Sequence, residues 1–412
     1  MYYPIHKPGT TIIRLTVKKV TGFFTKEFIQ VKITFAALMR IAVNTRFLLN
    51  DKLEGYGYFI LETFSRITRR YPEHEFIFIF DRPFDKRFIF GSNVTPVVAG
   101  PQARHPLLWK WWYDVKIPGV LKKHKADIFV SCDGFCSLTT KVPQCLVLHD
   151  LAYLRFPSFI KKPEVLFYKK QTPKFLKIAK SVATVSEFSK KDIVLHFPAA
   201  LKNISIVYSA AKEIFRPVSE EIKIVTKNKY TEGKEYFLYA GAIHPRKNPL
   251  NLVKAFSVFK KKQQTNMKLV LAGRLAWKYD SFLEKMKSYK YREDVILTGY
   301  LDEDELVKVM GAAYALVYPS FLEGFGVPVL EAMQCNVPVI TSSHSAMEEI
   351  AGEAALFIDP DSHEDIAEKM MQVYKDEKLR NELIMKGQLI TPQFSWDKTA
   401  TLLWQAILNA VD

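Results

Sequence analysis

The sequence predicts an α/β protein built from two Rossmann-like, doubly wound domains that face each other across a cleft. Its length of 412 residues is enough for two domains, each with a sizeable core. Short apolar runs alternate with amphipathic helical segments, which favours parallel sheets with right-handed crossovers. The alternation stops in a charged, weakly patterned connection at residues 208–235 and then starts again. This interruption predicts the domain boundary.

The first domain is predicted to span residues 39–215. It begins with Met39 and a first buried strand, and helical patterns cover residues 58–70 and 163–180. The expected strands are 40–44, 75–80, 127–131, 143–148, 181–185 and 204–207.

Residues 1–38 precede this regular pattern. They lack helical periodicity and clear caps, and they do not show the ordered regions of a signal peptide. We interpret them as an upstream start or a poorly ordered basic arm, so deleting them is expected to leave activity intact.

The second domain is predicted to span residues 216–392, and a final amphipathic helix is expected within residues 393–412. The helices expected in the second domain cover 249–262, 302–310 and 362–376. Its expected strands are 236–240, 268–272, 295–298, 314–318, 337–341 and 355–359.

The net charge of +16 and a pI near 9.4 suggest attraction to nucleotides, nucleic acid or an anionic membrane, although a lysine-rich proteome would give the same balance. No nucleic-acid-binding module is recognisable, so no nucleic-acid partner is expected. No apolar run reaches the roughly 20 residues that span a bilayer. Zinc is not expected either, because the cysteines do not have zinc-site spacing and fit reduced thiols of a cytoplasmic protein. These cysteines are Cys132, Cys136, Cys145 and Cys335.

The most informative segment runs from Tyr318 to Glu331, with the sequence YPSFLEGFGVPVLE. It follows an apolar strand, passes through a glycine-bearing loop, and is predicted to enter a helix at Pro328, since proline suits the first helical position. Glu331 is expected in the first turn of that helix. The segment therefore lies at the carboxyl end of a strand, which is the ligand-binding edge of an open α/β sheet.

Glu323 and Glu331 are spaced as Glu-x7-Glu around this helix start, where free N–H groups favour a phosphate. Carboxylates beside an anion site can accept hydrogen bonds from hydroxyl groups on either side of the anion. A nucleotide sugar has this layout, with ribose hydroxyls on one side of its diphosphate and sugar hydroxyls on the other. Gly324 and Gly326 permit close backbone approach. The alternative is that Glu331 only complements the helix dipole and Glu323 is a solvated loop residue.

Arg246 and Lys247 lie in the segment Gly241-Ala-Ile-His-Pro-Arg-Lys-Asn248, between a predicted strand and a predicted helix. An arginine fork and a lysine point charge together suit a diphosphate. Two solvated surface cations are the alternative. The same sheet edge carries the Glu323 loop, which favours phosphate binding.

Three further motifs follow first-domain strands. Gly55-Tyr56-Gly57 is either a tight turn or a segment whose backbone amides close over a phosphate or acceptor. It is not a full dinucleotide-binding fingerprint. His149-Asp150 places an imidazole at the end of a strand, where it either donates a hydrogen bond to a sugar hydroxyl or has a structural role. Ser186 reads first as a helix N-cap.

Two other patterns have competing interpretations. Asp302-Glu-Asp304 and Asp359-Pro-Asp361 resemble the D-x-D metal motif of some sugar transferases, but each precedes a helical pattern, so capping is favoured and no essential metal is expected. The basic aromatic segment 109–125 suits a membrane interface or, alternatively, core aromatics with a solvated lysine edge.

Together these motifs resemble a family-4 glycosyltransferase with the GT-B fold. The likeness covers Met39 to the C-terminus and is strongest between residues 236 and 365. The motifs that carry it are Gly241–Asn248, Leu271–Arg274, Leu297–Tyr300, the Glu-x7-Glu block, Gly55–Gly57, His149–Asp150 and Val185–Ser189.

The resemblance implies a retaining, metal-independent transfer of a hexose from a UDP- or GDP-sugar to a glycan or lipid-linked acceptor in cell-envelope polysaccharide synthesis. No cofactor is implied, and the implied location is the cytoplasm or the inner face of the cytoplasmic membrane. A catalytically inactive nucleotide-sugar-binding module is the alternative.

The resemblance also implies roles for individual residues. His149, Glu323, Arg246 and Lys247 would act at the reacting sugar and diphosphate, and Glu331 would hold the ribose. The acceptor would enter near Gly55, and the final helix would cross back to the first domain. Many members have an arginine where this chain has Ala242. The other implied substrate-binding residues are Tyr56, Gly57, Asp150, Thr298, Gly299, Tyr300, Leu301, Gly324, Phe325, Gly326 and Val327.

Overall fold

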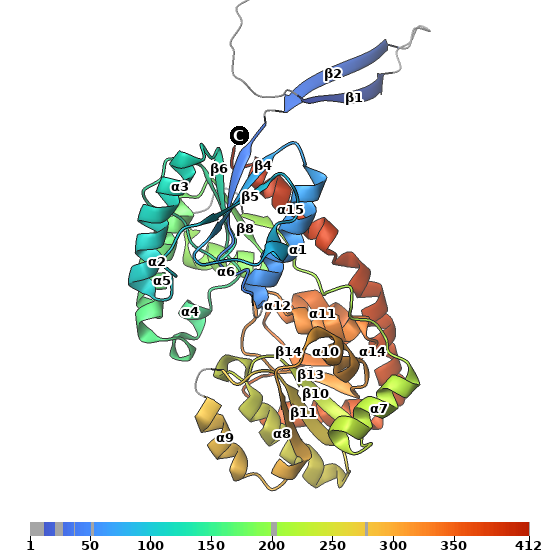
Figure 1. Cartoon of the computed structure of the whole chain (residues 1–412). Coiled ribbons are helices and arrows are strands. Elements are labelled where there is room, and N and C mark those ends of the chain that lie inside the picture. Colours follow the sequence, from blue (N-terminus) through green and yellow to red (C-terminus); the bar gives the residue numbers. More distant parts are fainter. Residues whose placement is uncertain are drawn as a thin grey trace, which may run out of the picture. The chain divides into compact units, whose positions relative to one another are not determined.

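The computed structural model describes residues 12–20, 28–36, 38–50, 53–198, 204–276 and 279–411. The chain forms two compact units (Figure 1). One contains residues 1–146, 178–181 and 404–412, and the other contains residues 147–177 and 182–403. The domain limits predicted from the sequence, after residues 215 and 392, stay a prediction.

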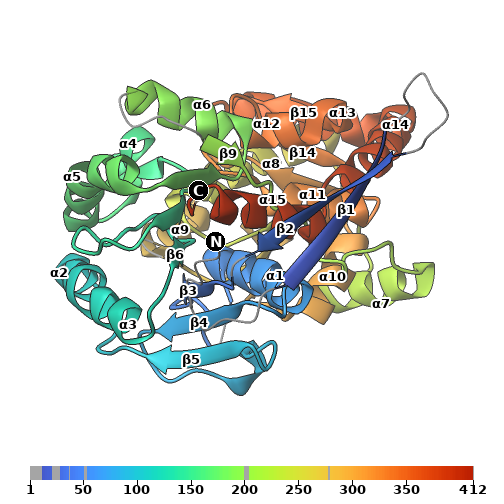
Figure 2. The ribbon, with the colours of Figure 1, turned by 90° about the horizontal axis from the view of Figure 1, so that it is seen from above.

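The first sheet has seven strands in the order β5-β4-β3-β6-β7-β8-β9. Parallel pairings join β5 to β4, β4 to β3, β3 to β6 and β6 to β7. Strands β8 and β9 also pair in parallel. Figure 2 shows β3, β4 and β5 side by side. The strands are β3 (Arg40–Asn44), β4 (Glu75–Phe80), β5 (Val94–Val98), β6 (Ile128–Ser131), β7 (Gln144–Val147), β8 (Ser181–Thr184) and β9 (Ile204–Ile206).

Strand β5 was not predicted from the sequence. This strand carries Pro96, which cannot donate a ladder hydrogen bond and is tolerated at a sheet edge. Its weak pattern therefore follows from its edge position.

Helix α1 (Gly55–Arg70) begins three residues earlier than predicted. Gly55, Tyr56 and Gly57 form its first turn and not a separate loop. A Cβ on Gly57 would lie 2.5 Å from the Phe47 carbonyl oxygen, so glycine is required there by close backbone approach. The other helices of this part are α2 (Pro106–Trp111), the π-helix η2 (Trp112–Lys116), α3 (Ile117–Lys123), α4 (Ala152–Arg155), α5 (Lys162–Ile178) and α6 (Glu187–His196).

The second sheet has six strands, all parallel, in the order β12-β11-β10-β13-β14-β15. Its first strand in the chain, β10, lies beside β13, so the strand order reverses between them. Ligands of open α/β sheets bind at such a switch point. The strands are β10 (Tyr236–Ala240), β11 (Lys268–Ala272), β12 (Val295–Gly299), β13 (Ala315–Tyr318), β14 (Val339–Ser342) and β15 (Ala355–Ile358).

Helix α7 (Glu220–Thr231) occupies the stretch that we expected to be an irregular connection, so that expectation was wrong. Ser219 caps the helix by accepting from the Ile222 N–H, and Lys229 pairs with Glu305 of α10. The further helices are α8 (Pro249–Gln263), α9 (Tyr279–Lys287), α10 (Glu303–Gly311), α11 (Val327–Gln334), α12 (Ala346–Ala351), α13 (His363–Lys375), α14 (Glu377–Ile390) and α15 (Trp396–Leu408).

The two ends of the chain add a hairpin and the final helix. Strands β1 (Ile12–Val20) and β2 (Phe28–Ala36) pair antiparallel, which the sequence analysis did not predict. Residues 1–11, 21–27 and 37 of the proposed arm lie outside the described residues, and its dispensability stays a prediction. In α15, Trp404 stacks on Tyr71 with ring centroids 4.0 Å apart. The end of the final helix thus returns to the first half, as predicted.

The basic aromatic segment is mainly core. Trp109, Trp112 and Tyr113 are buried, whereas Trp111 is partly exposed. Across the described residues, no helix combines the length and apolar character that a membrane span requires.

Candidate active site

The loops after β10 and β13 meet at the switch point of the second sheet. The first carries the short 3-10 helix η5 (Pro245–Lys247), and the second leads into α11. The Phe321 N–H donates to the Arg246 carbonyl oxygen at 3.0 Å, and the Arg246 guanidinium donates to the Leu322 carbonyl oxygen. The structure therefore joins the two motifs that the sequence placed at one sheet edge.

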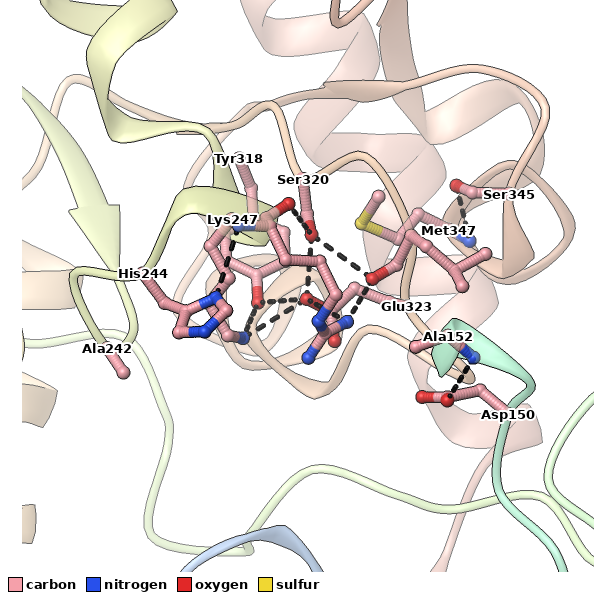
Figure 3. Close-up of polar contacts among 12 residues, drawn as sticks. Asp150, Ala152, Ala242, His244, Lys247, Tyr318, Ser320, Glu323, Ser345 and Met347 are labelled. Atoms are coloured by element: carbon pink, nitrogen blue, oxygen red, sulfur yellow. Dashed lines mark hydrogen bonds and ion pairs between the residues drawn. The ribbon is translucent and has the colours of Figure 1, made fainter. Parts of the chain in front are cut away.

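Glu323 lies at the centre of this junction, with its side chain 13% exposed. Its Oε1 accepts from Ser320 Oγ at 2.8 Å, and from Lys247 Nζ and the Tyr318 hydroxyl at 3.1 Å each. Arg246 lies 3.6 Å from the same oxygen. Figure 3 shows Lys247, Tyr318 and Ser320 converging on the carboxylate. This burial and these hydrogen bonds rule out the alternative that Glu323 is a solvated loop residue.

The charges of this cluster depend on one another. Burial alone raises the pKa of Glu323, but Lys247, Arg246 and the Ser320 hydrogen bond lower it to about 2. Burial lowers the pKa of Lys247, and Glu323 opposes that shift. Glu323 is therefore a carboxylate held in place between two cations at neutral pH.

Helix α11 starts beside this carboxylate. Gly326 precedes it with a φ of 101°, a left-handed conformation that favours glycine. The helix begins at Val327, so Pro328 is its second residue. Glu331 lies beyond the first turn, so the prediction that placed it in that turn was wrong, and the alternative that it only complements the helix dipole is not supported. It is 7% exposed, and burial raises its pKa to about 7.

Gly324 touches the backbone that carries His149. A Cβ on Gly324 would lie 2.4 Å from the His149 carbonyl oxygen. Ser186 Oγ donates to the Gly324 carbonyl oxygen at 2.7 Å, and Ser189 Oγ donates to the His149 carbonyl oxygen at 2.8 Å. The two serines thus hold the His149 backbone against the glycine loop.

The role of Ser186 as a helix cap is confirmed, because it also accepts from the Ser189 N–H. Asp150 makes a local contact as well: its Oδ1 accepts from the Ala152 N–H at 2.9 Å beside the start of α4, whose N-cap residue is Leu151 (Figure 3). The predicted contact of Asp150 with substrate stays a prediction.

The remaining predicted residues lie elsewhere. Thr298, Gly299, Tyr300 and Leu301 stand at the end of β12, two strands away from β10, and Tyr300 is exposed. Phe325 is buried in the glycine loop. Gly55, Tyr56 and Gly57 belong to the other compact unit. Their predicted contacts with the nucleobase, sugar and acceptor are not tested by this arrangement.

Three site residues were missed: Tyr318, Ser320 and His244. The first two are donors to Glu323. His244 Nδ1 accepts from the Arg246 N–H at 3.1 Å, and burial, with Arg246 next, lowers the pKa of His244 to about 4. All three stand within motifs already recognised. Their positions within these motifs could have marked them as candidate site residues, but their contacts depend on the conformation of the loops.

Both acidic pairs that resemble D-x-D motifs have local structural contacts. Asp302 caps α10 by accepting from the Glu305 N–H, as predicted. Asp359 accepts from the Asp361 N–H, but Ser362 is the cap of α13, so the capping prediction was wrong for this pair.

A second charged cluster lies at the corresponding switch point of the first sheet, between β3 and β6. Arg46 follows β3 and donates from Nε to Oδ2 of Asp133, which follows β6, at 2.7 Å. Tyr113 and Ser131 also donate to the Asp133 carboxylate. This cluster could not be predicted from the sequence, because its members come from separate segments and match no motif.

Comparison with known proteins identifies the family. Residues 220–389 match the family described as glycosyl transferases group 1. The chain is 30% identical over 254 residues to O-antigen chain mannosyltransferase B of Escherichia coli, covering 61% of this chain and 67% of that one. It is 30% identical over 276 residues to O-antigen chain mannosyltransferase RfbU of Salmonella typhimurium, covering 65% and 71%. The protein therefore belongs to the group 1 glycosyltransferases.

A solved structure gives the fold class. WaaG, a glycosyltransferase involved in lipopolysaccharide biosynthesis, matches with a TM-score of 0.73 at 15% identity, over 89% of this chain and 99% of that one. The predicted GT-B fold with two parallel-sheet, Rossmann-like domains is confirmed. Membership of family 4 stays a prediction.

Proposed function

We propose that the protein is a retaining, metal-independent mannosyltransferase that uses a nucleotide-diphosphate sugar and builds a cell-envelope polysaccharide of the O-antigen kind. The observation that carries this proposal is the cluster of Glu323, Lys247 and Arg246 beside the start of α11. The names of the two mannosyltransferase relatives support the choice of sugar and pathway.

The donor's diphosphate lies between the two cations and the first turn of α11. Arg246 and Lys247 supply positive charge, and the helix contributes its free N–H groups. Glu323 accepts hydrogen bonds from the transferred sugar, and Glu331 accepts from the ribose hydroxyls. This order of groups matches the order of sugar, diphosphate and ribose in the donor.

The chemistry follows from charge. As the bond from the anomeric carbon to the phosphate oxygen breaks, positive charge develops on the sugar and negative charge on the leaving diphosphate. Lys247 and Arg246 are already fixed by Glu323, so they stabilise that negative charge without reorganising. One such donor is typically worth about 3 kcal/mol. The leaving phosphate then accepts the acceptor's proton on the same face, which gives retention, and His149 stands beside the sugar.

We also propose peripheral contact with an anionic membrane through one face of the 106–123 helical run. Leu107, Trp111 and Val115 are exposed at intervals of four residues, and Lys116 lies over the Trp111 ring at 4.7 Å. Apolar side chains beside lysine suit a membrane interface. Trp111→Glu should reduce cosedimentation with anionic vesicles; unchanged cosedimentation would contradict this contact.

A transfer assay tests the function. The protein is incubated with GDP-mannose, UDP-glucose or UDP-galactose and with an envelope glycan acceptor, and the linkage of the product is determined by NMR. We expect transfer from the mannose donor with retained anomeric configuration and in the presence of EDTA. Nucleotide binding without transfer from any donor would instead favour an inactive sugar-nucleotide-binding module.

A further inference from the structure

Glu349 of helix α12 caps helix α6, which follows a strand of the other sheet. Its Oε1 accepts from the Glu187 N–H at 2.9 Å, and its Oε2 accepts from the Phe188 N–H at 2.8 Å. Both amides belong to the first turn of α6, where N–H groups have no partner within their own helix. The two helices lie side by side in the same compact unit (Figure 2). The cap therefore comes from a residue 162 positions after Glu187 in the chain.

The capped turn carries the two serines that hold the His149 backbone. Ser186 Oγ accepts from the Ser189 N–H at 3.0 Å, so three successive N–H groups of the turn have side-chain acceptors. The positive end of the helix dipole also favours the Glu349 carboxylate. The hydroxyl groups of Ser186 and Ser189 donate to the carbonyl oxygens of Gly324 and His149. Glu349 thus fixes the turn from which both hydroxyl groups donate.

Helix α12 also supports the glycine loop from a second direction. A Cβ on Gly326 would lie 2.6 Å from Cγ of Met347, which stands in the first turn of α12. Burial raises the pKa of Tyr208, and the charge of Glu349 and a hydrogen bond with it raise this pKa further. The Tyr208 ring lies 6.4 Å from the Phe325 ring, centroid to centroid. Glu349 and its neighbours are therefore linked to successive residues of the glycine loop.

The cations of the donor site are held by different contacts. Lys247 and Ser320 donate to Glu323, and the Phe321 N–H donates to the Arg246 carbonyl oxygen. These contacts join the loops after β10 and β13. Loss of the α6 cap should therefore move the His149 backbone relative to the glycine loop and leave the two cations in place.

We propose that Glu349 is a positioning residue for sugar transfer. By capping α6 it sets the distance between the His149 backbone and the loop that follows Glu323, and it acts through Ser186 and Ser189 without contact to the donor. The inference rests on the proposed function, in which His149 and Glu323 stand beside the transferred sugar. A displacement of about 1 Å at a reacting group can lower turnover about a hundredfold.

Two substitutions at this position test the assignment. Glu349→Ala removes both acceptor oxygens, whereas Glu349→Gln keeps the shape of the side chain and one acceptor. We expect kcat to fall about a hundredfold in the alanine variant and only about tenfold in the glutamine variant. The KM for the donor and the Kd for GDP or UDP should not change, because the cations stay in place. Glu348→Gln is the matched control: Glu348 is the exposed neighbour on α12 and accepts locally from the His344 N–H.

A double-mutant cycle shows whether Glu349 acts through the serines. Ser189→Ala should lower kcat by itself, and adding Glu349→Ala should cost little more, because the two side chains serve the same contact. Each variant is first shown to be folded by thermal unfolding. Losses of kcat that multiply, or an unchanged kcat in Glu349→Ala, would overturn the proposal. So would a loss of nucleotide affinity as large as the loss of kcat, since the effect would then not be confined to the His149 side.

Amide hydrogen exchange tests the same link without requiring transfer. In Glu349→Ala, exchange should become faster in residues 149–152 and 186–190 and stay unchanged in residues 236–248. Unchanged exchange in the first two segments would overturn the inference. Absence of transfer by the wild-type protein with every donor would instead overturn the proposed function, and exchange alone would then decide whether Glu349 fixes the His149 backbone.

Discussion

The two sheets carry charged clusters at equivalent switch points, and the clusters differ in how much of their charged side chains is exposed to solvent. In the first sheet, Arg46 and Asp133 are 6% and 0% exposed. Asp133 also accepts from Tyr113 and Ser131, and the Arg46 guanidinium lies 4.7 Å from the Phe47 ring centroid. Both charged side chains therefore have protein partners inside the fold.

In the second sheet, the corresponding cations are more accessible. Arg246 and Lys247 are 21% and 19% exposed, and the start of α11 and the glycine loop lie beside them. A cluster that stays partly accessible next to free N–H groups can bind an anion. Topology therefore makes a switch point in each sheet, and we expect the residual exposure of its charged side chains to determine whether it binds a ligand.

The largest expected effect is on stability, at the closed cluster. Arg46→Leu leaves the Asp133 carboxylate buried without its cation, so the free energy of unfolding should fall by about 3–5 kcal/mol. Urea denaturation measures this loss. Arg40→Leu is the control: Arg40 pairs with Glu75 on the surface, and its loss should cost less than about 1 kcal/mol. Similar costs for the two variants would remove the distinction between the clusters.

The next effect is on catalysis, at the accessible cluster. Lys247→Ala should lower kcat by about a hundredfold or more, because it removes a charge that stabilises the leaving diphosphate. Steady-state kinetics and thermal unfolding are measured together, with the exposed Lys261→Ala of α8 as the control. Near-normal turnover in a folded Lys247→Ala protein would count against the assignment.

A third comparison uses one glycine from each part. Gly324→Ala places a Cβ against the His149 carbonyl oxygen, so the loop must shift and stability should fall by about 1–3 kcal/mol, with loss of activity. In Gly55→Ala the new Cβ meets no atom within 4 Å. That change should be neutral or stabilise by about 0.4–1 kcal/mol. Equal effects of the two alanines on stability and activity would refute the requirement for glycine at 324.

The smallest expected effect is a pH dependence of donor binding through Glu331. Burial raises the pKa of Glu331 to about 7, with opposing effects of Lys212, which lowers it, and Glu303, which raises it. The ionised form accepts from ribose hydroxyls, so affinity should increase as pH rises through 7. Between pH 6 and pH 8 the ionised fraction, and with it the affinity, should rise about tenfold.

Isothermal titration with an intact nucleotide sugar measures this dependence, since its diphosphate lacks the terminal phosphate that ionises near pH 6. Glu331→Gln should bind weakly at both pH values. A wild-type affinity that is flat from pH 6 to pH 8 would contradict the role of Glu331.

Much of the fold was predictable because buried parallel strands and amphipathic helices leave periodic patterns. Two strands illustrate this. Both ends of β10 were predicted correctly, and the predicted end of β12 was one residue too early. β5 was missed because an edge strand can include Pro96. α7 was missed although Ser219 and the acidic first turn are N-terminal helix signals.

The site was predictable only where its residues are close in sequence. Glu323, Arg246 and Lys247 could be found because their loops have recognisable residue types and spacing. The contacts of Tyr318 and Ser320 with Glu323 required the folded loop. Arg46 and Asp133 are 87 residues apart and meet only because β3 and β6 are neighbours.

The most direct test of the donor site is a thermal-shift titration with UDP, GDP and ADP. It compares the wild-type protein with Lys247→Ala and Glu331→Ala, each first shown to be folded. We predict that one of these nucleotides raises the Tm of the wild-type protein and that both substitutions weaken this stabilisation. The absence of stabilisation by any nucleotide, or equal stabilisation of all three proteins, would contradict a donor site at the second switch point.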